Sequence, residues 1–86
     1  MNRSLIQFHL EEALEELVET LDAIKNERIY SDSDFRTGME HLYHHLNFAW
    51  NTRNLSSQYV NDHTDETFYE LRKFPLDIDL RDPSED

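Results

Sequence analysis

Apolar residues recur at steps of three and four along the first third of the chain, with polar residues between them. This spacing predicts a helix over residues 3–28, because positions three or four apart share one helix face. Acidic side chains fall on the far side of this helix, where we expect them to face solvent. The apolar stripe consists of Ile6, Leu10, Ala13, Leu14, Leu17, Leu21 and Ile24.

A second helix, predicted over residues 33–54, carries two stripes on opposite sides. We expect the main stripe to pack against the Leu-rich stripe of the first helix. A surface helix ordinarily has one apolar stripe, so the second stripe needs a cover of its own. The main stripe consists of Phe35, Met39, Leu42, Leu46, Ala49 and Arg53. The second stripe consists of His41, His45, Phe48, Thr52 and Leu55.

The lone glycine of the chain, Gly38, lies inside this second helix. One interpretation is a cost of about 1 kcal/mol in helix stability relative to Ala. The other is that Gly38 permits a close crossing with the neighbouring helix. The sequence leaves both open.

The segment IYSDSD separates the two helices, and Asp32 or Ser33 is the predicted cap of the second. Two helices joined by about four residues must run antiparallel, so the sequence predicts a helical hairpin. Residues 56–63 are predicted to be a connection or a frayed helix end. After them, Thr64 is the predicted cap of a short third helix that ends before Pro75.

The tail alternates Leu76, Ile78 and Leu80 with aspartates, which predicts an extended segment with one apolar edge. This segment either lies across the hairpin as a clasp or is free to meet a partner. The predicted fold is therefore all-α: an antiparallel hairpin, a short third helix and an extended C-terminal arm, with a dimeric four-helix bundle as one outcome. We expect a single domain over residues 1–81 and a disordered acidic tail over 82–86.

Charge and composition limit the functions that this architecture can serve. The 86 residues include 19 acids and 8 Lys and Arg, giving a formal charge of −11. Phosphate backbones and anionic membranes need basic patches, so neither nucleic acid nor a membrane is an expected partner. Cys is absent, which excludes disulfides and thiolate metal sites. We expect a non-enzymatic cytoplasmic protein without a cofactor, and the sequence identifies no catalytic residue.

His41 and His45 are the candidate metal ligands, because residues at i and i+4 share a helix face. A metal site would need a third ligand, from His9, His63 or another chain. The first helix offers a second route to metal chemistry, since its acids repeat the E-x-x-E spacing with which Mg²⁺-dependent hydrolases hold a cation. These pairs are Glu12 with Glu15, Glu16 with Glu19, and Glu19 with Asp22.

The second stripe of the second helix is the predicted interface: His41, His45, Phe48, Thr52 and Leu55. Exposed apolar patches of this kind mark interaction sites, unless the third helix or the tail covers them within the chain. The expected function is a non-enzymatic protein-interaction module that binds itself as a homodimer through this helix, with a further protein partner that the sequence does not identify. A metal-binding protein or metal-dependent hydrolase is the alternative.

A polar and aromatic group near the end of the second helix gives a last candidate, a small-ligand pocket. The competing interpretation is structural: a packed Trp with its N–H bonded, and an Arg paired with an acid. The group consists of Tyr43, Asn47, Trp50, Asn51 and Arg53.

Overall fold

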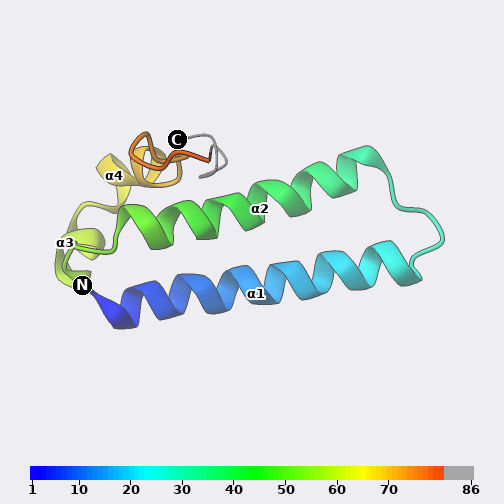
Figure 1. Cartoon of the computed structure of the whole chain (residues 1–86), viewed down its shortest axis with the longest axis horizontal. Coiled ribbons are helices and arrows are strands. Elements are labelled where there is room, and N and C mark those ends of the chain that lie inside the picture. The colour runs from blue at the N-terminus through cyan, green and yellow to red at the C-terminus, as the bar shows by residue number, and fades with distance from the viewer. Residues whose placement is uncertain (81–86) are drawn as a thin grey trace.

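Two long helices, α1 (Arg3–Asn26) and α2 (Asp32–Asn51), lie side by side and antiparallel in the computed structural model (Figure 1). The structure describes residues 1–80, and at 64–67 it describes the backbone alone. Two short helices follow, α3 (Ser57–Asp62) and α4 (Thr64–Leu71), and no strand occurs within residues 1–80. The predicted all-α hairpin is confirmed. One difference is that residues 57–62 form a helical turn of their own, and the predicted tail at 82–86 lies outside the described residues.

A reciprocal pair of hydrogen bonds begins α2. The backbone N–H of Asp34 donates to Ser31 Oγ (3.1 Å), and the backbone N–H of Ser31 donates to Asp34 Oδ2 (3.0 Å). This is a capping box, which satisfies two otherwise unpaired donors at the helix start. The prediction of Asp32 or Ser33 as the cap was therefore wrong, because Ser31 has the extended backbone of a cap and Asp34 lies three residues beyond it.

The open end of the hairpin is closed by Asn2. Its side-chain oxygen accepts from the N–H of Leu5 and so caps α1 (3.1 Å). Its backbone N–H donates to the carbonyl of Arg53 (2.7 Å), and its side-chain amide donates to the carbonyl of Leu55 (2.9 Å). The two long helices are thus joined at both ends, by the loop at one end and by Asn2 at the other.

Small side chains form much of the contact between α1 and α2. Ala13 and Ala49 are 4% and 6% exposed, and Thr52 is fully buried. A Cβ added at Gly38 would lie 2.8 Å from Thr20 Oγ1, closer than side chains tolerate. Gly38 therefore allows the helices to approach closely, which decides between the two interpretations of this glycine.

This close contact leaves most of the large apolar residues of the two main stripes exposed, contrary to the prediction, while Ala13 and Ala49 are the buried members of these stripes. Leu10 and Leu17 of α1 are 48% and 41% exposed, and Phe35 and Leu46 of α2 are 44% and 41% exposed. The physical reason is that small residues set the face along which the helices meet. The larger side chains then lie about a quarter turn away, on the side of the hairpin.

Candidate functional site

The stripe predicted as an interface lies largely inside the chain. Phe48 is 6% exposed and Thr52 is fully buried, while His45 and Leu55 are half-buried. The ring of Phe48 contacts those of His9 on α1 (centroids 5.1 Å apart) and Phe68 on α4 (5.6 Å). Helices α1 and α4 therefore cover the stripe within one chain, and His41 is its one well-exposed member. Of the two outcomes that the sequence left open for this stripe, cover within the chain is the one observed.

Three imidazoles gather around Phe48. The ring centroid of His45 lies 6.2 Å from that of His9 and 5.1 Å from that of His44. The Nδ1 atoms of His9 and His45 are buried and have no hydrogen-bond partner among the described residues. Burial lowers the pKa of His9 to about 4, and repulsion from His45 and His44 adds to the effect. Burial also lowers the pKa of His44, with smaller contributions from His45 and Arg72. His9 and His44 are therefore neutral at pH 7.

The two candidate metal ligands have different surroundings. His41 Nδ1 lies 3.5 Å from Glu16 Oε1, and the His41 side chain is 60% exposed. His45 instead lies against His9 and His44. Within the described side chains, no group of three or more His, Cys, Asp or Glu is placed to hold a metal ion.

The E-x-x-E acids of α1 do not converge on one face. Glu15, Glu19 and Asp22 are exposed, as predicted, whereas Glu12 and Glu16 are half-buried toward the rest of the chain. A cation held by carboxylates needs several oxygens around one point. The described acids of α1 are distributed around the helix and provide no such point.

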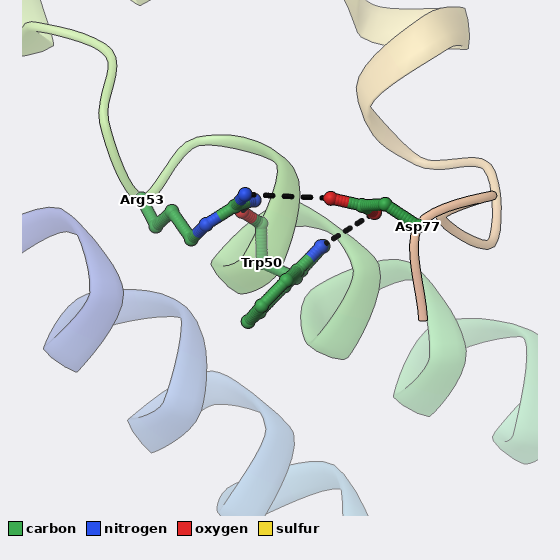
Figure 2. Close-up of polar contacts among 3 residues, drawn as sticks. All are labelled: Trp50, Arg53 and Asp77. Carbon is green, nitrogen blue, oxygen red and sulfur yellow. Dashed lines mark hydrogen bonds and ion pairs between the residues drawn. The ribbon is translucent and has the colours of Figure 1, made fainter. Parts of the chain in front are cut away.

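Trp50 and Arg53 hold the C-terminal segment by way of Asp77 (Figure 2). Trp50 Nε1 donates to Asp77 Oδ1 (2.9 Å), and Arg53 Nη2 lies 3.4 Å from Asp77 Oδ2. The guanidinium of Arg53 also stacks over the indole, 3.8 Å from the ring centroid. The hydrogen bond from Trp50 is the main cause that lowers the pKa of Asp77. The structural interpretation is confirmed for both residues: the Trp50 N–H is hydrogen-bonded, and Arg53 is paired with an acid.

Two asparagines of α2 bind the end of α4. Asn47 Nδ2 donates to the carbonyl of Arg72 (2.8 Å), and Asn51 Nδ2 donates to those of Leu71 (2.7 Å) and Lys73 (2.9 Å). The last carbonyls of a helix have no partner within it, so these amides take the place of a cap. The Asn47 and Asn51 amides, which were proposed to line a ligand pocket, are thus engaged in fixing α4 against α2.

Large, partly exposed apolar residues lie along one side of the hairpin, and we call this side the Leu-rich flank. Thr20 meets Gly38 and Glu16 meets His41, so these residues show which side of each helix faces the other. About a quarter turn further round, antiparallel pairing brings the large apolar residues of both helices to the same side. The flank consists of Leu10, Leu14, Leu17, Leu21 and Ile24 of α1 with Phe35, Tyr43 and Leu46 of α2, each between 41% and 60% exposed.

Most acidic residues of α1 lie away from this flank. Glu15 and Glu19 are on the opposite side of the helix, Asp22 is about a quarter turn away, and Glu11 lies at the edge of the flank beside Leu14. The flank is therefore free of negative charge along its middle, on a chain whose formal charge is −11. Sequence periodicity identified the residues of this surface but assigned them to the interior.

The tail is attached to the hairpin through Asp77, which contacts Trp50 and Arg53. Pro75 is buried and Ile78 is half-buried, but Leu76 and Leu80 are fully or mostly exposed. The apolar edge predicted to lie across the hairpin is therefore not laid against it at Leu76 and Leu80. Within the described part of the chain, no helix is both long and apolar enough to cross a membrane.

No family model matches the chain, and no curated protein or solved structure is significantly similar to it.

Proposed function

We propose that this protein is a non-enzymatic protein-interaction module whose binding surface is the Leu-rich flank. The observation that carries the proposal is the size of this surface. Its eight residues together leave on the order of 800 Å² accessible, whereas the largest apolar patch on an ordinary monomer is about 300–600 Å². Contiguous apolar area beyond that range marks an interaction site.

The distribution of charge supports the same function. Because most acids of α1 are on other sides of the helix, a partner can cover the middle of the flank without desolvating carboxylates. The high net charge meanwhile keeps the rest of the surface soluble. We propose that the module is cytoplasmic. A protein without cysteine forms no disulfides, so it does not need an oxidising compartment.

Thiol labelling tests whether the flank is covered, since the natural chain has no cysteine that would react. Leu21→Cys places a single thiol on the flank, at a position 46% exposed in one chain. Glu15→Cys is the matched control, exposed on the opposite side of the same helix. Labelling rates would be measured on the full-length variants, both purified and in lysate of the cells that produce the chain.

We expect Leu21→Cys to react at least tenfold more slowly than Glu15→Cys, because a bound partner excludes the reagent. Equal rates in lysate and at every concentration of purified protein would show that the flank is bare, and the proposed function would then be wrong.

A further inference from the structure

We infer that the partner on the Leu-rich flank is a second copy of this chain, so that two hairpins form a four-helix bundle. The inference rests on the proposed function and names the partner of that same surface. It replaces the predicted interface at Phe48 and Thr52, which are buried within the chain.

The area of the flank fits a symmetric dimer. Each partner in a standard protein interface buries about 800 Å², which is the order of what the eight flank residues expose. In a two-fold dimer the same patch from each chain covers the other, so the two areas must be equal. The single chain also exposes 6899 Å², whereas a compact monomer of 10.4 kDa exposes about 5,400 Å².

The interior of one chain is too small to explain a stable fold. Among the described side chains, the buried apolar ones are those of Ala13, Phe48, Ala49 and Pro75. The larger side chains that would ordinarily make a core are on the flank. A chain of this kind needs its flank covered whenever it is folded, and a second copy is the partner always present in equal amount.

The spacing of the flank is that of a bundle core. Leu10, Leu14, Leu17, Leu21 and Ile24 alternate steps of four and three, which is the repeat that packs helices at a shallow angle. An antiparallel pair of helices with such a seam on one side is half of a four-helix bundle. With most acids of α1 away from this side, two chains of charge −11 can meet without opposing carboxylates at the centre.

Light scattering on the wild-type chain and two variants tests the inference. Leu17→Asp puts a charge in the middle of the flank. Phe8→Asp is the control: Phe8 is on the opposite side of α1 from Leu17 and is 52% exposed. We expect the wild type and Phe8→Asp to have twice the mass of one 10.4 kDa chain at micromolar concentration. Leu17→Asp should weaken dimerisation at least a hundredfold.

Thermal unfolding of the wild type tests the inference even if Leu17→Asp does not fold. If folding and association are linked, the melting temperature rises with protein concentration. A wild-type chain of single mass with a concentration-independent melting temperature would overturn the inference. So would a dimer that persists in Leu17→Asp but is lost in Phe8→Asp.

The failure of this inference can be told from that of the proposed function. If the purified chain is a monomer while Leu21→Cys is still protected in lysate, the flank binds a different protein. The proposed function then stands and the second copy is excluded. If Leu21→Cys is unprotected under both conditions, both proposals are wrong.

Discussion

The two sides of α2 carry comparable apolar side chains but differ in what lies over them. On one side, Phe48 is 6% exposed beneath His9 of α1 and Phe68 of α4. On the other side, Phe35 and Leu46 keep about two-fifths of their surface accessible. Hydrophobicity alone does not explain this difference. Directional hydrogen bonds place α4 over one side of α2, whereas Phe35 and Leu46 on the other side stay partly exposed.

Truncation of a side chain on the covered side should have the largest effect. We expect Phe48→Ala to lower the free energy of unfolding by about 3–5 kcal/mol, because a buried ring is removed and a cavity remains. The loss should be the same at all protein concentrations, since the contacts of Phe48 lie within one chain. Urea unfolding at several concentrations measures it.

Phe35→Ala is the matched change on the Leu-rich flank. Phe35 is 44% exposed, so its truncation should cost about half as much in the separated chain. If a second copy covers the flank, the difference in free energy of unfolding between Phe35→Ala and the wild type grows with protein concentration. A cost equal to that of Phe48→Ala in dilute solution would contradict the contrast between the two sides.

The helical hairpin could be predicted because its signals are local. Apolar residues at steps of three and four define each helix, and the short connection requires antiparallel packing. The start of α2 was predicted within one residue of its observed position. Its cap was misassigned because Ser31, Asp32 and Ser33 all have side chains that can cap a helix. The partner of Arg53 was correctly predicted to be an acid, which the structure shows to be Asp77.

The faces of the helices could not be assigned from periodicity. A stripe of large apolar residues is equally compatible with packing in one chain and packing between chains. Here the approach of Gly38 to Thr20 and the small residues Ala13 and Ala49 fix the contact within the chain. The placement of α4 depends on Asn47 and Asn51, whose bonds span at least twenty residues and leave no periodic signal.

The next largest effect should come from acidification, which lowers the stability of the covered side of α2 through His9. In the folded chain the pKa of His9 is about 4, below the ordinary value of 6.5 that it regains on unfolding. The unfolded chain therefore binds more protons between these values, so stability falls as the pH is lowered through this window and changes little more on this account below pH 4. We expect a loss of about 2 kcal/mol between pH 7 and pH 5, measured by urea unfolding.

His9→Leu separates this effect from other titrations. It retains an apolar side chain against Phe48 but cannot be protonated, so the decline between pH 7 and pH 5 should largely disappear. Carboxylates with lowered pKa, Asp34 and Asp77, stabilise the fold above their unfolded pKa near 3.8 and lose this contribution only at lower pH. An unchanged decline in His9→Leu would assign the acid sensitivity to other groups.

The smallest expected effect comes from breaking the hydrogen bond between Asn47 and Arg72, which holds α4 against α2. Asn47 is 7% exposed and its amide donates to the carbonyl of Arg72, 25 positions along the chain. Asn47→Ala leaves that carbonyl without its donor, and we expect a loss of about 1–2 kcal/mol. Asn54→Ala is the control, because Asn54 is exposed and should change stability by less than about 0.5 kcal/mol.

Hydrogen exchange shows where the cost of Asn47→Ala falls. If the asparagine bonds hold α4 in place, the amides of α4 should exchange faster in Asn47→Ala while those of α1 change little. The ring of Phe48 would then lose part of the cover that Phe68 provides, and the covered side of α2 would come to resemble the Leu-rich flank. Faster exchange spread evenly over α1 and α4 would mean that Asn47 supports the fold as a whole, and that hydrophobic contact alone is enough to hold α4 on α2.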